Sequence, residues 1–182
     1  MPMRTIVLAD DCALVREELK AVLARRADLS VASEAADGLE LLRVLEELDR
    51  PDLVILDISM PKLDGIEALR TLRRLDPSAR VLVFTMHRDE GLLIQAFLAG
   101  ADGYLLKDDA AKELFVAIDG VLEGRTYISP TMQREVKDAW LKTFVSLKES
   151  HPGEPLSSQE IDLLRHLAGE EPGRRKGGSR YD

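Results

Sequence analysis

The sequence predicts an α/β fold in which a doubly wound parallel sheet of five strands is covered by helices on both faces. Two observations support this prediction. Short apolar runs alternate five times with longer amphipathic stretches over residues 1–125, which is the pattern of parallel strands joined by helices. Most of the runs are also continuous and β-branched, as expected for strands that are buried on both faces.

Strands and helices can be assigned in chain order from this alternation. Each amphipathic stretch places its apolar residues on one face, which predicts a helix after each strand. The connecting loops are short, as such units require. The predicted strands cover Thr5–Ala9, Leu29–Ser33, Leu53–Leu56, Val81–Phe84 and Gly103–Leu106, and the predicted helices cover residues 15–25, 41–48, 66–75, 90–99 and 111–123.

The pattern changes after Gly124. Apolar residues recur every three or four positions between Thr131 and Lys148, which predicts one long amphipathic linker helix. Its apolar stripe must be buried, either against the preceding domain or against a second helix in a dimer or partner. The chain is therefore divided into a domain at residues 1–125, a linker at 126–155, and a helical fragment with a disordered tail at 156–182. The stripe comprises Val136, Trp140, Phe144 and Leu147.

Composition and charge exclude several classes of protein. The 182 residues carry a formal net charge of −8, which argues against a protein that is basic all over and coats nucleic acid. No apolar run approaches the ~18 residues that a membrane-spanning helix needs, and the first residues do not form a signal peptide. The one cysteine, Cys12, excludes an internal disulfide and fits a reducing cytosol. A cytoplasmic protein without membrane contact is expected.

Acidic side chains follow two of the predicted strands. Asp10 and Asp11 follow the first strand, and Asp57 follows the third. With the strand order 2-1-3-4-5 these strands are neighbours, so the three carboxylates converge. Carboxylates that lie close together raise one another's pKa, and a hard cation such as Mg²⁺ relieves the repulsion. Thr85 and Lys107 follow the fourth and fifth strands, which gives the site groups that can hold a phosphoryl group on a carboxylate.

The motifs at these strand ends resemble those of two-component response regulators, and the resemblance covers residues 4–125. It implies a flavodoxin-like receiver domain. The segments Phe84–His87 and Gly103–Asp108 are similar to the NarL/FixJ subfamily in particular. The matching motifs are Asp10-Asp11, Leu56-Asp57-Ile58-Ser59-Met60-Pro61 with Asp64-Gly65, Thr85-Met86-His87, and Lys107-Asp108.

The resemblance also implies a role for each site residue. Asp57 would take a phosphoryl group from a sensor histidine kinase, which makes the chain a switch with only its own Mg²⁺-dependent phosphorylation and dephosphorylation, rather than a metabolic enzyme. Asp11, Asp57 and the backbone carbonyl of Ser59 would hold Mg²⁺, with Asp10 acting largely through water. The remaining implied roles are phosphoryl binding by Thr85 and Lys107, an inward-swinging switch at Tyr104, and tuning of dephosphorylation by Ser59 and His87.

The last part of the chain resembles the opening helix of a LuxR-type helix-turn-helix domain, over residues 156–169. That helix is a scaffold, whereas bases are read by a later recognition helix in the major groove. No such helix follows in this sequence, and two interpretations stay open. In one, the protein in its full form binds DNA and regulates transcription, with DNA as a partner only if the missing residues exist. In the other, it is a receiver without a DNA reader that acts through protein–protein contacts, and its own DNA binding is weak and strongly salt-dependent.

Overall fold

Six parallel strands form one sheet in the computed structural model, which describes residues 3–48, 50–76 and 78–136. The strand order is β2-β1-β3-β4-β5-β6, which confirms the predicted order of the first five. Ala9 at the end of β1 lies opposite Leu56 at the end of β3, so the chain leaves both strands at the same edge of the sheet. The strands are β1 (Arg4–Ala9), β2 (Leu29–Ala35), β3 (Leu53–Leu56), β4 (Arg80–Thr85), β5 (Gly103–Leu106) and β6 (Tyr127–Ile128).

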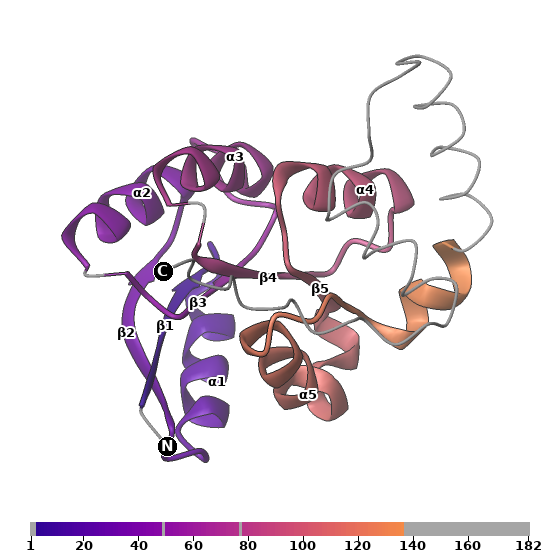
Figure 1. Ribbon diagram of the computed structural model, residues 1–182, viewed down its shortest axis with the longest axis horizontal. Helices are drawn as coiled ribbons and strands as arrows, with labels where there is room; N and C mark the ends of the chain where they lie inside the picture. Colours follow the sequence, from indigo (N-terminus) through magenta and orange to yellow (C-terminus); the bar gives the residue numbers. More distant parts are fainter. Residues whose placement is uncertain (1–2, 49, 77, 137–182) are drawn as a thin grey trace, which may run out of the picture.

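Helices cover both faces of this sheet, as predicted. The helices α2, α3 and α4 lie on one face, and α1 and α5 lie on the other (Figure 1). Val54 and Leu56 of β3 belong to the hydrophobic cluster under the first layer, whereas Ile55 belongs to the cluster under the second, which explains the continuous apolar run. The helices are α1 (Ala13–Leu23), α2 (Gly38–Glu47), α3 (Gly65–Leu75), α4 (Glu90–Ala99) and α5 (Ala110–Leu122), with a 3-10 turn, η1 (Lys107–Asp109), before α5. Across the described part of the chain, no helix combines the length and apolarity needed to cross a membrane.

Aspartate side chains cap three of the helices. Asp37, Asp64 and Asp89 accept hydrogen bonds from backbone N–H groups in the first turns of α2, α3 and α4, respectively. Capping satisfies N–H groups that the helix itself leaves unpaired. All three caps lie in loops that follow strand ends, so they fix the loops at the edge of the sheet where the predicted site lies.

A sixth strand extends the sheet beyond the five that the sequence predicts. In the turn after α5, Gly124 has a φ of 80°, which favours glycine and lets the chain turn back along β5. Tyr127 and Ile128 then pair in parallel with Gly103 and Tyr104. A run of two residues shows no period, so sequence patterns do not reveal such a strand.

The predicted linker helix begins against the domain at residues 1–125. Residues 130–136 are helical, and Met132 and Val136 are fully buried in the cluster beneath α2, α3 and α4. For Val136, the structure therefore shows burial against the preceding domain. Trp140, Phe144 and Leu147, and the helical fragment predicted at residues 156–169, lie outside the described residues.

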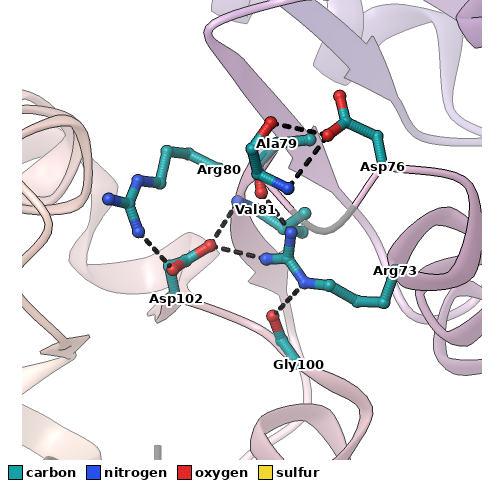
Figure 2. A network of polar contacts seen from close by, with 8 residues as sticks. Arg73, Asp76, Ala79, Arg80, Val81, Gly100 and Asp102 are labelled. Carbon is teal, nitrogen blue, oxygen red and sulfur yellow. Dashed lines mark hydrogen bonds and ion pairs between the residues drawn. The ribbon is translucent and has the colours of Figure 1, made fainter. Parts of the chain in front are cut away.

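A buried ion-pair network, here called the Asp102 clamp, lies at the opposite edge of the sheet from the predicted site. The Asp102 carboxylate accepts hydrogen bonds from Arg73 of α3 at 2.7 Å, from Arg80 of β4 at 3.0 Å and from the Val81 amide at 2.9 Å (Figure 2). Arg73 also donates from Nε to the carbonyl of Gly100 at the end of α4, at 2.8 Å. The clamp therefore joins α3, β4, the end of α4 and the start of β5.

Candidate functional site

Three carboxylates meet where β1 and β3 end. One oxygen from each of Asp10, Asp11 and Asp57 lies within 4.8 Å of the others. Asp10 and Asp57 are buried, whereas Asp11 is exposed. The backbone places them together, because the Asp57 amide donates to the carbonyl of Ala9 at 2.8 Å and so extends the pairing of β1 with β3 to the strand ends. The predicted convergence of these side chains is what the structure shows.

The ammonium group of Lys107 joins two of these carboxylates. Its Nζ lies 2.6 Å from Asp10 Oδ2 and 2.8 Å from Asp57 Oδ2. Lys107 directly follows β5, and its charged end also lies over the ring of Phe84. Burial acts to lower the pKa of Lys107, but the hydrogen bonds and charges of Asp10 and Asp57 outweigh it and raise this pKa above its usual value. Lys107 is therefore a fixed positive charge next to the Asp57 carboxylate.

Burial makes the charge of Asp10 unfavourable. It raises the pKa of Asp10 above its ordinary value, against the lowering effect of the hydrogen bonds from Lys107 and from the Cys12 amide. The backbone of this turn is held by Arg16, which donates to the Asp10 carbonyl at 2.6 Å and pairs with Glu34 of β2 at 3.1 Å. The turn thus holds a buried carboxylate that a bound cation would stabilise.

The loop after β3 supplies Ser59 and Gly65. The Ser59 amide donates to Asp57 Oδ1 at 3.3 Å, and the Ser59 hydroxyl lies 2.5 Å from Nε2 of His87. Ser59 and His87 thus join the loops after β3 and β4 next to Asp57. Gly65 packs so close to this loop that a Cβ on it would lie 2.2 Å from the Asp57 carbonyl oxygen, so the loop needs glycine here.

Thr85 of β4 and Tyr104 of β5 both bond to the backbone of His87. Thr85 is fully buried at the end of β4, and its Oγ1 accepts from the His87 amide at 3.3 Å. Tyr104 is also fully buried, and its hydroxyl donates to the His87 carbonyl at 2.9 Å. Burial raises the pKa of Tyr104, with smaller contributions from Asp89 and Asp57, so the phenol stays neutral and donates. Both side chains therefore hold the same residue, His87, by its backbone.

Contacts in the structure link all of the site residues predicted within residues 1–125, and two further residues that the sequence pattern did not indicate support the backbone of the site. The side chain of Lys107 and the amide of Ser59 contact these carboxylates. The other site residues are linked to Ser59 through His87, and they are Thr85 and Tyr104. For Val136, whose cover the sequence left open between the preceding domain and a dimer or partner helix, the structure shows burial against the preceding domain. The missed residues are Arg16, which holds the Asp10 turn, and Ser129, which is buried beside β5. The only sequence signal for Arg16 was its place in the first turns of a helix directly after two acids.

Comparison with known proteins identifies the family of this chain. The family model of the response regulator receiver domain matches residues 6–119. Oxygen regulatory protein NreC of Staphylococcus epidermidis is 33% identical over 168 residues, covering 90% of this chain and 76% of the relative. Transcriptional regulatory protein LnrK of Bacillus subtilis is 32% identical over 170 residues, covering 91% of this chain and 77% of the relative.

The crystal structure of a LuxR-family two-component response regulator from Aurantimonas sp. SI85-9A1 aligns with a TM-score of 0.72 at 39% identity. This alignment covers 76% of the present chain and 99% of the other. The identity and coverage of these relatives exceed what a shared fold alone would give. The chain belongs to the LuxR-type two-component response regulators and contains their receiver domain.

Proposed function

We propose that Asp57 accepts a phosphoryl group from a sensor histidine kinase, and that the phosphorylated receiver controls transcription. The observation that carries this proposal is the setting of the Asp57 carboxylate. It lies at a strand end, 2.8 Å from the Lys107 ammonium and within 4.8 Å of two other carboxylates. A nucleophilic carboxylate with a cation beside it and a cation site next to it is the arrangement that a phosphoryl acceptor needs.

The transfer exchanges one bond to phosphorus for another. An oxygen of the Asp57 carboxylate forms a bond to phosphorus as the bond from phosphorus to the imidazole nitrogen of the kinase breaks, and that nitrogen takes up a proton. Lys107 then pairs with a phosphoryl oxygen in place of the carboxylate oxygen. Attack of water on the phosphorus returns the receiver to its unphosphorylated state, because it releases inorganic phosphate and restores the Asp57 carboxylate. The receiver thus needs no group beyond this site to return to its starting state.

The carboxylates fit a bound Mg²⁺. Three carboxylate oxygens within 4.8 Å of one another form an oxygen donor set, and burial raises the pKa of Asp10, so a divalent cation would offset the unfavourable charge. Asp11, Asp57 and the Ser59 carbonyl would hold the metal, with Asp10 acting through water. When bound, Mg²⁺ neutralises charge that develops on the phosphoryl oxygens.

Thr85 and Tyr104 would convert phosphorylation into a conformational change. The Thr85 hydroxyl is the group of β4 that lies next to the site, and drawing it toward a phosphoryl oxygen would pull on its hydrogen bond with the His87 amide. Because Tyr104 holds the carbonyl of the same residue, the loop after β4 and the strand β5 would respond together. Phosphorylation would thereby shift an existing equilibrium between two arrangements of this face.

Ser59 and His87 would set the lifetime of the phosphorylated state. Their side chains are joined at 2.5 Å, and the Ser59 amide donates to Asp57 Oδ1 at 3.3 Å. We expect this pair to hinder the approach of an attacking water, so removing the contact would ease that approach. Ser59→Ala and His87→Ala should therefore both hydrolyse the phosphorylated Asp57 faster than the unchanged chain does.

Transcriptional control is the output that the relatives support. NreC and LnrK are named as regulatory proteins, and LnrK as a transcriptional one, and each aligns over most of its own length with this chain. We therefore favour a regulator that binds DNA in its full form over a receiver that acts only through protein contacts.

Intact-mass measurement with a small phosphodonor tests the proposed acceptor. The full 182-residue chain is incubated with acetyl phosphate and Mg²⁺, and the expected product is heavier by one phosphoryl group. Asp57→Asn should abolish this product. Asp64→Asn is the matched control, because it changes an aspartate in the same loop and still caps α3, and it should be phosphorylated like the unchanged chain. Undiminished phosphorylation of the Asp57→Asn variant would refute the assignment.

A further inference from the structure

Ser129 is a buried polar residue that the proposed phosphotransfer does not use. It is fully buried, and it bonds to β5 at two points. Its amide donates to the Tyr104 carbonyl at 2.9 Å, and its hydroxyl accepts from the Leu106 amide at 2.8 Å. These two residues of β5 flank Leu105, and Leu106 directly precedes Lys107, whose ammonium holds Asp57. Ser129 therefore fixes the strand that carries Tyr104 and Lys107.

Residues 127–136, here called the arm, are docked on the receiver along this strand. Tyr127 and Ile128 pair with β5, and the Tyr127 hydroxyl donates to Glu113 of α5 at 2.6 Å. The Thr131 hydroxyl donates to Asp109 at 3.1 Å. Beyond it, Met132 and Val136 are fully buried in the cluster that also contains Tyr104, Ile94 and Phe97. The arm thus completes the core on the side of α4 and β5.

A charged residue of the arm, Glu135, also attracts Arg88 of the loop after β4. Arg88 of this loop pairs with Asp108 at 2.7 Å, and this hydrogen bond raises the pKa of Arg88, with Glu135 of the arm adding a smaller contribution of the same sign. Arg88 is the neighbour of His87, whose backbone is held by Thr85 and Tyr104. The arm therefore contacts β5 directly, whereas its Glu135 acts on Arg88 of the loop after β4 only through the attraction of opposite charges.

We propose that docking of the arm and phosphorylation of Asp57 stabilise each other through Ser129. A phosphoryl group on Asp57 needs Thr85 and Lys107 in fixed positions, and the docked arm fixes the strand on which Lys107 is carried. A receiver with the arm docked would bind the phosphoryl group more tightly, and by reciprocity the phosphoryl group would hold the arm more firmly. Since the chain continues from the arm toward its output segment, the arm is the route by which the site reaches that segment. This inference rests on the proposed function, because it needs a phosphoryl group at Asp57.

Hydrogen exchange of the full chain tests the coupling, with beryllofluoride and Mg²⁺ as the probe that stands in for the phosphoryl group. In the unchanged chain we expect beryllofluoride to slow exchange of the arm amides as well as those of the loop after β4. Ser129→Ala removes the acceptor of the Leu106 amide. It should abolish the response of the arm and weaken beryllofluoride binding by about fivefold or more, at the lower end of couplings between sites. Ser78→Ala, at an exposed serine, should leave both unchanged.

Thr131→Ala keeps the inference testable if Ser129→Ala does not fold. It removes only the hydrogen bond to Asp109, and a single hydrogen bond contributes modestly. We therefore expect it to weaken beryllofluoride binding, and the slowing of exchange in the arm, by about twofold each. Slowed exchange in the loop after β4 without any change in the arm would overturn the inference and leave the proposed function intact. Unchanged binding in both variants would overturn it as well. Failure of beryllofluoride to alter exchange anywhere in the unchanged chain would refute the proposed function and this inference with it.

Discussion

Replacement of Asp102 by alanine should destabilise the receiver strongly without disabling its site. The Asp102 side chain is 8% exposed, and its ion-pair partners Arg73 and Arg80 are 16% and 26% exposed. The alanine variant leaves both guanidinium groups without their carboxylate and the buried Val81 amide without its acceptor (Figure 2). Each of the three hydrogen bonds to this charged carboxylate contributes about 1.5 kcal/mol, so the expected loss is about 4.5 kcal/mol. This agrees with the about 3–5 kcal/mol typical of breaking a buried ion pair.

Urea denaturation followed by circular dichroism measures this loss. With an m-value of about 2 kcal/mol per molar urea, the midpoint of unfolding should fall by about 2 M. Glu123→Ala is the matched control, because it removes a carboxylate from a pair with Arg125 that is exposed on both sides, and it should cost less than about 1 kcal/mol. Beryllofluoride binding by the folded Asp102→Ala variant should be unchanged, since Asp102 precedes β5 and the site follows it. A midpoint shift no larger than that of the control would refute the assigned role of the clamp.

Three further predictions follow from individual contacts. Burial raises the pKa of Asp10, so the charge of Asp10 opposes folding above the pKa that it has in the unfolded chain. Asp10→Asn should therefore raise the melting temperature of the metal-free chain at pH 7. The same variant should weaken Mg²⁺ binding by about tenfold, as calorimetric titration would show. The hydrogen bond from Lys62, together with that from the Glu40 amide, lowers the pKa of Asp37, so the ionised Asp37 carboxylate stabilises the fold. This stabilisation is fully present above the pKa of Asp37 in the unfolded chain, and it is lost as the pH falls through the lower pKa of Asp37 in the folded chain. Asp37→Asn, which keeps the cap, should then melt lower than the unchanged chain at pH 7, and the difference should vanish in acid. Gly65→Ala should lower the free energy of unfolding by about 1–3 kcal/mol or more, because the added Cβ would lie 2.2 Å from the Asp57 carbonyl oxygen and the backbone would have to move. Equal denaturation midpoints for the variant and the unchanged chain would show that the loop is free to adjust.

The carboxylate site was predictable because it depends on strand ends and strand order. Continuous apolar runs fix where β1 and β3 end, and the order of the sheet then brings Asp10, Asp11 and Asp57 together. Lys107 was predictable for the same reason, since it follows β5 directly. The contacts of Tyr104 and Ser59 with His87 were not, because they depend on how two loops meet rather than on where strands end.

Three other features could not be derived from the sequence pattern. The strand β6 has two residues, too few for a period, so the docking of the arm and the role of Ser129 could not be anticipated. Asp102 reads as one more acid in a turn before a strand, and only the folded chain brings Arg73 to it from α3. The apolar stripe predicts that Val136 is buried, but it does not tell whether the preceding domain or a second helix covers this residue. The structure shows that the preceding domain covers Val136.

Locating the phosphoryl group chemically tests directly whether Asp57 is the residue that accepts it. The chain is phosphorylated with acetyl phosphate and Mg²⁺ and then reduced with borohydride, which converts an aspartyl phosphate to homoserine. Peptide mass spectrometry then reads the modified position. Homoserine is expected at position 57 and at no other aspartate. Homoserine at Asp10 or Asp11 instead, with Asp57 unmodified, would contradict it.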